Sequence, residues 1–246
     1  MTLYLHNVTY GIIDNSGNKK NIINKLNLQI DKGTFVSLIG KSGTGKSTIF
    51  KLIAGLINAE EGEICVNGHP ASLGCVGYMP QRDLLLPWRT VLENLMLVRE
   101  IQKDSLVTKE KAREWLERVG LLEYENALPS ELSGGMRQRV AFLRTVLTGK
   151  EVLLLDEPFG ALDALTKREM HSWLLSFWQQ LNKTIFFITH DLEEAVLLSD
   201  KIILLHPNDQ AEEFKVELPR PRNAQMIHTV EMIKYRQNLE KRISNE

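Results

Sequence analysis

The chain has 246 residues, about one and a half times the length of a typical domain, so it holds either one large domain or two small ones. It carries 30 lysines and arginines against 31 aspartates and glutamates, which gives a net charge of −1. This balance excludes a protein whose affinity comes from neutralising the phosphates of a nucleic acid. Hydrophobic residues at 43% and charged residues at 25% are typical of a globular chain, neither disordered nor fibrous.

No segment of the sequence predicts export or insertion into a membrane. The first residues, MTLYLHNVTYG, have neither a basic start nor a long apolar stretch, so we expect no secretory signal. No apolar run approaches the roughly 18 residues that a spanning helix needs. We therefore expect a cytoplasmic protein that reaches a membrane only through a partner.

The chain has two cysteines, Cys65 and Cys75. Their spacing matches neither a set of metal ligands nor a disulfide framework. We interpret both as small, buried, hydrophobic residues of strands in a reducing compartment.

The first third of the chain predicts mainly strands. Residues 3–10 and 23–30 alternate between apolar and polar side chains, and the polar, turn-rich segment 11–21 between them predicts a hairpin loop. The apolar run 34–39 leads directly into glycines, as expected for a strand that is buried on both faces. The other elements expected in this part are a helix at Ile49–Leu56 and strands at Glu63–Val66 and Val76–Met79.

Residues 82–149 have a helical pattern. Thr108 is a candidate N-cap, and Gly120 stands where a helix-ending glycine belongs. Between them is an apolar stripe at helical spacing that we assign to core packing, made of Ala112, Trp115, Leu116 and Val119.

Strands and helices alternate again after residue 150. The expected order is Val152–Leu155 (strand), Thr166–Gln180 (helix), Thr184–Thr189 (strand), Leu192–Leu198 (helix) and Lys201–Leu205 (strand). The whole pattern predicts a parallel α/β core with a helical subdomain inserted in its middle. From Pro207 the tail is polar, with a weak helical pattern at Met226–Leu239.

The segment GKSGTGKS fits the phosphate-loop pattern. Its glycines let backbone N–H groups turn towards phosphate oxygens, and a helix starting near Lys46 points its positive end at the same anion. Lys46 can neutralise the β- and γ-phosphates of ATP, and the Ser47 hydroxyl can ligate Mg²⁺. The alternative is a glycine-rich turn without a ligand. The predicted binding residues are Gly40, Lys41, Ser42, Gly43, Thr44, Gly45, Lys46, Ser47 and Thr48.

The apolar strand VLLLD ends in two acids, Asp156 and Glu157. Open α/β sheets bind ligands at the carboxyl ends of their strands. Successive strand residues point to opposite sides, so we predict different roles: Asp156 holds Mg²⁺, and Glu157 orients or deprotonates the water that attacks the γ-phosphate. Alone, this segment predicts only a strand end; together with the phosphate loop it favours catalysis.

A third motif, LSGGMRQ at Leu132–Gln138, offers a second anion site. Ser133 can cap the following helix, and Gly134 and Gly135 can expose N–H groups at its start. With the two motifs above, it resembles the ATP-binding subunits of ATP-binding-cassette (ABC) transporters, and the resemblance extends to about Leu205.

Four single residues are similar to further positions of that family. Gln81 matches the Q-loop glutamine, Asp163 in GALD the D-loop aspartate and His190 in ITHD the switch histidine. Tyr10 is placed like the aromatic residue that stacks on adenine, with Tyr4 and His6 as nearby competitors. From the residues alone, His190 could equally be a structural histidine and Tyr10 a packing residue.

The resemblance implies a P-loop NTPase (RecA-like) core with an N-terminal antiparallel β subdomain and an inserted α-helical subdomain. It also implies a homodimer in which Ser133 and Gly135 of one protomer face the ATP held by Lys46 of the other. Gln81 then joins Ser47 and Asp156 at Mg²⁺, and joins Lys46, Glu157 and His190 in catalysis. The expected parts of one ABC ATPase domain, 1–246, are the core (1–81 and 151–206), the helical signature subdomain (82–150) and a tail (207–246).

The strings Arg82–Leu95 and Asp156–Met170 resemble importers of nitrate, sulfonates, taurine and thiamine precursors. This resemblance implies two transmembrane permease subunits, an indirect extracytoplasmic solute-binding protein, and a place on the cytoplasmic face of the membrane. The apolar run Leu84–Trp88 is either buried in the subdomain or, by our hypothesis, receives the coupling helix of the permease. The transported solute stays open.

Two other functions fit the sequence less well than import. The first is a soluble cassette that clamps on nucleic acid or on another protein, which the near-zero net charge disfavours. The second is a nucleotide-sensing module without turnover, which the presence of Lys46, Glu157 and His190 disfavours.

Overall fold

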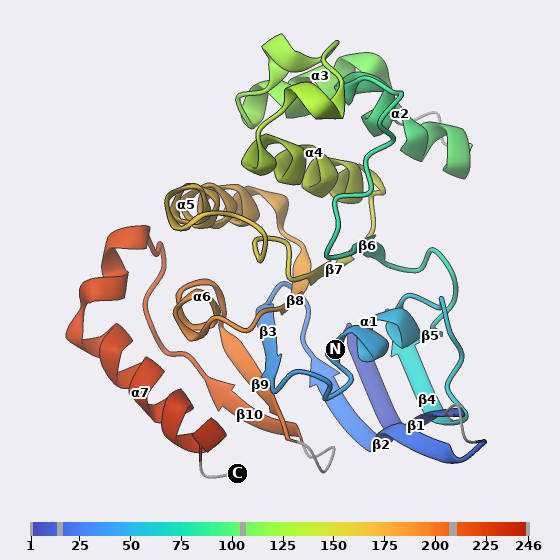
Figure 1. Cartoon of the computed structure of the whole chain (residues 1–246), viewed down its shortest axis with the longest axis vertical. Coiled ribbons are helices and arrows are strands. Elements are labelled where there is room, and N and C mark those ends of the chain that lie inside the picture. The colour runs from blue at the N-terminus through green and yellow to red at the C-terminus, as the bar shows by residue number, and fades with distance from the viewer. Residues whose placement is uncertain (1, 14–16, 104–106, 207–210, 245–246) are drawn as a thin grey trace.

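The structure is a computed structural model that describes residues 2–13, 17–103, 107–206 and 211–244. At its centre is a six-stranded sheet in the order β10-β9-β3-β8-β7-β6, with all neighbours parallel except the antiparallel pair β10 and β9 (Figure 1). The predicted α/β class is confirmed. The strands are β3 (Phe35–Gly40), β6 (Gly77–Met79), β7 (Val152–Asp156), β8 (Thr184–Ile188), β9 (Lys201–Leu205) and β10 (Ala211–Lys215).

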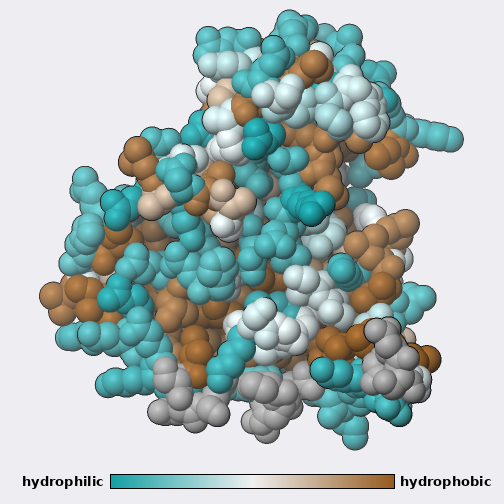
Figure 2. All heavy atoms as spheres, viewed as in Figure 1, coloured by the Kyte–Doolittle hydropathy of each residue, from teal (hydrophilic) through white to brown (hydrophobic). Residues whose placement is uncertain are grey.

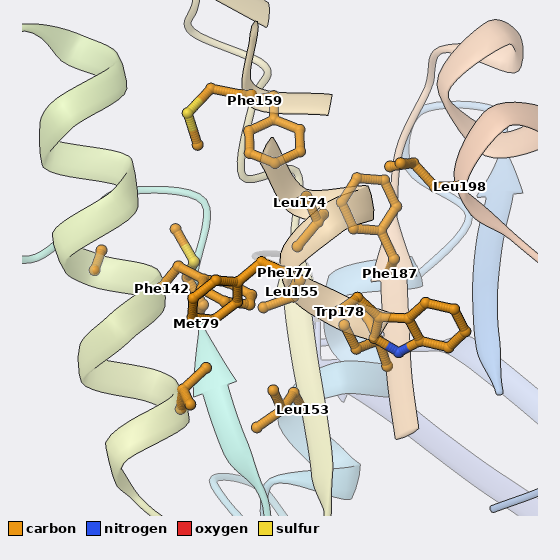
Figure 3. Close-up of a cluster of buried hydrophobic side chains, with 14 of the residues drawn as sticks. Met79, Phe142, Leu153, Leu155, Phe159, Leu174, Phe177, Trp178, Phe187 and Leu198 are labelled. Atoms are coloured by element: carbon orange, nitrogen blue, oxygen red, sulfur yellow. The ribbon is translucent and has the colours of Figure 1, made fainter. Parts of the chain in front are cut away.

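The central strands are buried on both faces. Along β7, Leu153 and Leu155 pack into one hydrophobic cluster, while Val152 and Leu154 pack into another on the opposite face. The first cluster contains side chains of α4 (Gly134–Leu147), α5 (Ala164–Leu181) and α6 (Leu192–Leu198), several of which surround β7 in Figure 3. Each buried side chain of this size contributes about 1.5–3 kcal/mol of hydrophobic stabilisation.

A second, antiparallel sheet covers the other hydrophobic cluster. Its order is β2-β1-β4-β5, and α1 (Lys46–Ile53) contributes Ile49 and Phe50 to the same cluster. The predicted loop 11–21 was too long: Gly11 still pairs with Asn21, and residues 14–16 lie outside the described residues. The strands are β1 (Leu3–Ile13), β2 (Lys19–Ile30), β4 (Glu61–Val66) and β5 (His69–Pro70).

Three helices stand together at one end of the molecule (Figure 1). They are α2 (Val91–Gln102), α3 (Lys109–Arg118) and α4, and two 3₁₀ turns, at Leu122–Tyr124 and Pro129–Glu131, lie between α3 and α4. Thr108 caps α3, as predicted, because its hydroxyl accepts the N–H of Lys111 at 3.2 Å. The predicted stripe faces the core: Ala112, Leu116 and Val119 are buried and Trp115 is half-buried.

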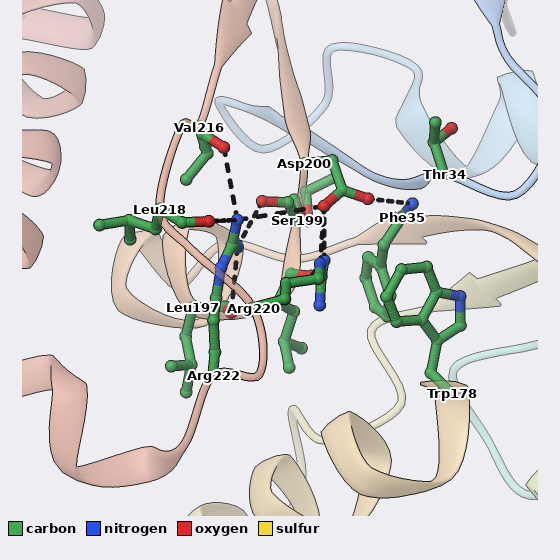
Figure 4. Close-up of polar contacts among 12 residues, drawn as sticks. Thr34, Phe35, Trp178, Leu197, Ser199, Asp200, Val216, Leu218, Arg220 and Arg222 are labelled. Carbon is green, nitrogen blue, oxygen red and sulfur yellow. Dashed lines mark hydrogen bonds and ion pairs between the residues drawn. The ribbon is translucent and has the colours of Figure 1, made fainter. Parts of the chain in front are cut away.

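The segment after residue 210 is more ordered than its polar composition suggested. It forms β10, a 3₁₀ turn at Ala224–His228 and α7 (Val230–Ser244), which begins and ends later than the weak pattern predicted. Arg222 is almost fully buried and donates to five backbone carbonyls, and Arg220 binds Asp200 at 2.7 Å (Figure 4). These contacts fix the C-terminal segment to α6 and to the turn that precedes β9.

Two further expectations were wrong in detail. The helix after the phosphate loop begins at Lys46, as the phosphate-loop pattern predicted, and ends at Ile53, so the bounds Ile49–Leu56 expected from the apolar pattern were too late. Cys65 and Cys75 are half-buried rather than buried, and Cys75 lies in a bend, where its thiol contacts the carbonyl of Ile53.

Within the described ranges, every helix is too short or too polar to span a lipid bilayer. Figure 2 shows hydrophilic side chains over much of the face in view, with hydrophobic ones in smaller groups between them.

Candidate functional site

The phosphate loop joins the end of β3 to the start of α1. Gly43 and Gly45 adopt φ values of 82° and 85°, a left-handed conformation that strongly favours glycine. Gly40 is required for another reason, because a Cβ there would lie 2.6 Å from the carbonyl oxygen of Leu205. The loop thus curls tightly at the N-terminus of α1, where free N–H groups and the helix dipole favour an anion.

Lys46 occupies the centre of this loop. Its ammonium donates to the carbonyl oxygens of Gly40 at 2.8 Å and Lys41 at 2.9 Å. Burial lowers the pKa of Lys46, and the nearby carboxylates of Glu157 and Asp156 oppose that shift. A partly desolvated ammonium is a strong partner for phosphate.

A cavity of about 680 Å³ opens over the loop. Glycines and hydroxyls of the loop and α1 line one side, and Tyr10, Ile12 and Ile22 of the antiparallel sheet line another. Glu157 and His190 complete it. The sequence offered three aromatic residues for stacking on adenine. Of these, Tyr10 alone is among the cavity-lining residues that the structure describes. Tyr4 and His6 instead stack on each other, with centroids 5.9 Å apart, at a separate surface hollow.

Asp156 lies at the tip of β7, directly behind the loop. Its carboxylate accepts the hydroxyl of Ser47 at 3.1 Å and that of Tyr78 at 3.3 Å. Burial raises the pKa of Asp156, partly offset by the Ser47 hydrogen bond. Burial, together with Asp156, raises the pKa of the Tyr78 phenol. Sequence reasoning missed Tyr78, because its contact with Asp156 depends on the pairing of β6 with β7, which no local pattern predicts.

The donors around Asp156 fit Mg²⁺. The ion prefers oxygen ligands and is usually held by one or two carboxylates together with substrate phosphates and water. Ser47 and Asp156 supply a hydroxyl and a carboxylate at the phosphate loop. Among the described residues there is no group of three or more His, Cys, Asp or Glu side chains that could hold a metal by itself.

Glu157 directly follows β7 and contacts residues that follow the two neighbouring strands, β6 and β8. Its Oε2 accepts the amide of Gln81 at 3.2 Å and lies 3.4 Å from Nδ1 of His190. Its backbone has φ of 45°, a conformation that non-glycine residues rarely adopt, and its N–H donates to Ile188 at 3.0 Å. Local strain of this kind is often found at functional sites.

His190 follows β8 and projects from it. Its side chain is 62% exposed, so it is not a satisfied core histidine, the alternative that the sequence left open. The imidazole faces the cavity beside Glu157. The structure therefore gathers Lys46, Glu157 and His190 at one cavity.

Other predicted site residues lie away from this cavity. Ser133 caps α4 by accepting the N–H of Met136 at 3.3 Å, as predicted, and Asp163 caps α5 through the N–H groups of Leu165 and Thr166. A Cβ on Gly135 would lie 2.8 Å from Thr166, so close packing of α4 against α5 requires glycine there. Residues predicted to bind nucleotide that do not line the cavity are Lys41, Thr44, Ser133, Gly134, Gly135 and Asp163.

Comparison with known proteins identifies the family. The sequence model of the ABC transporter family matches residues 23–160, which include the phosphate loop, the signature motif and both acids of β7. The chain belongs to the ABC transporter family. It is an ATP-binding subunit and an ATPase, and its α/β core has the P-loop NTPase fold that the sequence predicted.

This ABC protein is similar to known ABC proteins over most of its length. It is 44% identical to the formylaminopyrimidine import ATP-binding protein ThiZ of Halalkalibacterium halodurans, over 90% of this chain and 88% of that one. It is 42% identical to the aliphatic sulfonates import ATP-binding protein SsuB of Bacillus cereus, over 85% of each. The dimeric structure of the ABC transporter cassette MJ0796 matches with a TM-score of 0.77 at 29% identity, over 88% of this chain and all of that one.

Proposed function

We propose that this ABC subunit hydrolyses ATP to energise the import of a small solute, and that it does so as a homodimer. Each ATP lies between Lys46 of one protomer and Ser133 to Gly135 of its partner. One observation carries the proposal: Lys46, Glu157 and His190 line a single cavity, whereas the signature residues at the start of α4 lie outside it. A second copy supplies them to the same nucleotide in this arrangement.

In this proposal different residues of the chain bind the phosphates, the adenine and the Mg²⁺ ion. The loop Gly40–Thr48 holds the phosphates through backbone N–H groups and Lys46, and Tyr10 stacks on the adenine. Ser47, Asp156 and Gln81 hold Mg²⁺, which neutralises phosphate charge when bound. Asp163 stands at the protomer boundary.

The proposed chemistry is attack of water on the γ-phosphate. Glu157 orients that water or takes its proton, because its carboxylate lies in the cavity beside the phosphate loop. Gln81 and His190 both contact Oε2 of Glu157, so each can place the water and contact the γ-phosphate. Lys46 and His190 line the same cavity and can donate hydrogen bonds to the negative charge that develops on the γ-phosphate in the transition state.

The proposal of import follows from the names of the relatives, both of which are import ATP-binding proteins. We infer two permease subunits as partners, reached at the cytoplasmic face of the membrane, and an extracytoplasmic solute-binding protein that acts through them. Leu84 and Trp88 are 57% and 72% exposed, which favours the docking hypothesis over burial for these two side chains. We also propose that residues 1–246 form one ABC ATPase domain with the three parts expected above.

Complementation between two inactive variants tests the shared site. Lys46→Ala removes the phosphate-binding charge, and Ser133→Arg blocks the signature turn. In a mixed dimer one site keeps Lys46 from one protomer and Ser133 from the other, so an equimolar mixture should recover up to about a quarter of the wild-type rate. Each variant alone should be inactive. A mixture that stays inactive although the proteins dimerise would exclude the shared site.

A further inference from the structure

A buried carboxylate lies directly behind the segment that carries His190. Glu194 of α6 is 3% exposed. Its Oε1 accepts Nε2 of His171 at 2.6 Å and lies 4.0 Å from the ammonium of Lys167, both on α5. Its Oε2 accepts the hydroxyl of Thr189. With Glu194 as a carboxylate, the N–H at Nε2 of His171 is the donor of this hydrogen bond.

These contacts hold the residues on either side of His190. The hydroxyl of Thr189, besides donating to Glu194, accepts the N–H of Asp191 at 3.0 Å, so both of its hydrogen-bonding roles are used. Asp191 is held in turn by Lys167 at 2.8 Å and caps α6. The backbone on both sides of His190 is thus anchored to α5 and α6, while the imidazole itself is mostly exposed.

A buried carboxylate is an expensive way to stabilise a fold. Removing an ion from water costs several kcal/mol, and well-packed apolar residues often stabilise such positions as well or better. Glu194 directs one of its two oxygens at Thr189, the residue just before His190. Its placement is better explained by orientation of the loop than by stability.

We infer that Glu194 is a positioning residue for ATP hydrolysis that acts through Thr189 to hold His190 towards Glu157. The inference rests on the proposed catalytic role of His190. It makes a specific prediction. Without the imidazole of His190, the position of the segment that carries it no longer affects the reaction, so replacing Glu194 should no longer change the rate of ATP hydrolysis.

A double-mutant cycle tests this prediction. Glu194→Gln keeps the shape and loses the charge, and it is made both in the wild-type protein and in His190→Ala. The rate of hydrolysis of radiolabelled ATP is measured with Mg²⁺ and the full-length enzyme in excess, so that slow turnover is still resolved. We expect a fall of about tenfold with His190 present and less than about twofold with His190→Ala. ATP affinity should be unchanged within about twofold, because the phosphate loop is intact.

The matched control is Glu193→Gln on the same helix, whose carboxylate binds Arg236 instead of the loop. It should leave the rate unchanged. A second pair of variants keeps the test valid if Glu194→Gln misfolds. Thr189→Val, which lacks the hydroxyl, should slow hydrolysis when His190 is present but not in His190→Ala. Thr189→Ser, which keeps the hydroxyl, should hydrolyse ATP at the wild-type rate.

The outcomes separate the inference from the function on which it rests. Equal losses from Glu194→Gln in both backgrounds, or equal rates for Thr189→Val and Thr189→Ser, would overturn the positioning role alone. If His190→Ala hydrolyses ATP like wild type, the proposed role of His190 fails, and the inference fails with it.

Discussion

The amide of Gln81 donates to Oε2 of Glu157 at 3.2 Å, and the same oxygen lies 3.4 Å from His190. Gln81 follows β6, Glu157 follows β7 and His190 follows β8, which are adjacent strands of the parallel sheet. Their carboxyl ends meet at one edge, where such sheets place ligands. Three segments that are far apart in the chain therefore converge on one carboxylate.

Replacing this carboxylate should separate binding from turnover. We expect Glu157→Gln to bind ATP normally and to hydrolyse it about 10²–10⁴-fold more slowly, because the amide can hydrogen-bond water but cannot act as a base. The unhydrolysed ATP should favour a closed dimer in gel filtration. Glu151→Gln, just before the opposite end of β7, is the control and should be fully active. Wild-type turnover in Glu157→Gln would remove this residue from catalysis.

The lowered pKa of Lys46 predicts how ATP affinity depends on pH. Burial places this pKa below the ordinary value of 10.5, and bound phosphates favour the charged form, so the pKa rises in the complex. Affinity should therefore fall, by at most about tenfold per pH unit, as pH rises through the pKa of the free protein. Calorimetry should detect proton uptake on binding there. Lys46→Met should bind weakly with no such uptake; uptake that persists in this variant would assign the proton elsewhere.

The sequence predicted which polar residues lie at the carboxyl edge of the sheet, because local patterns define that edge. Buried parallel strands are continuous apolar runs, and the polar residue that ends each run must lie at the carboxyl edge. Asp156, Glu157 and His190 follow this rule. Gln81 was assigned by the resemblance; the structure shows that its amide donates to Glu157, and its role stays a prediction.

Other features depend on contacts between distant segments, and no local pattern announces them. Tyr78 reaches Asp156 only because β6 pairs with β7. In the sequence, Glu194 and His171 are indistinguishable from surface residues of amphipathic helices. Their hydrogen bond exists only because α5 packs against α6. In the sequence, Arg222 is one of many charged residues of the C-terminal segment, and its burial is visible only in three dimensions.

The raised pKa of Asp156 predicts a conflict between binding and stability. Because burial disfavours its ionised form, the folded protein carries a cost at neutral pH that is absent below the unfolded pKa of about 3.8, where the group is protonated in both states. Asp156→Asn should therefore raise the free energy of unfolding at pH 7 by about 0.5–2 kcal/mol without nucleotide. The gain should vanish near pH 3, and the added stabilisation by Mg²⁺ and ATP should be lost. Denaturant titrations test this, and a less stable variant at pH 7 would contradict it.

The exposed side chains of Leu84 and Trp88 predict where the permease docks. The loop that carries them is fixed from behind, because Arg144 donates to the carbonyls of Asp83 and Leu84 at 2.6 and 2.8 Å. We expect Trp88→Glu to reduce copurification of the coexpressed permease by about tenfold or more, since a charge would be buried in an apolar contact. ATP binding should be unchanged. Ile101→Glu, at an equally exposed site on α2, is the control; equal loss in both variants would point to a nonspecific effect.

Arg222 holds the C-terminal segment against α6 and the turn before β9. Its guanidinium donates to carbonyls of Val196, Leu197, Ser199, Val216 and Leu218, and burial lowers its pKa to about 10, still well above neutral. Arg222→Met keeps the apolar stem but leaves these carbonyls without a donor, so the free energy of unfolding should fall by about 3 kcal/mol.

Denaturant unfolding followed by tryptophan fluorescence measures this loss, and Arg168→Met, at an exposed position on α5, should change stability by less than about 0.5 kcal/mol. Because α6 follows the His190 segment and the carbonyls of Val196 and Leu197 that accept from Arg222 belong to it, α6 of the variant should also unfold locally before the rest of the domain. Amide exchange in α6 that is no faster than in wild type would show that the tail is stable without this arginine.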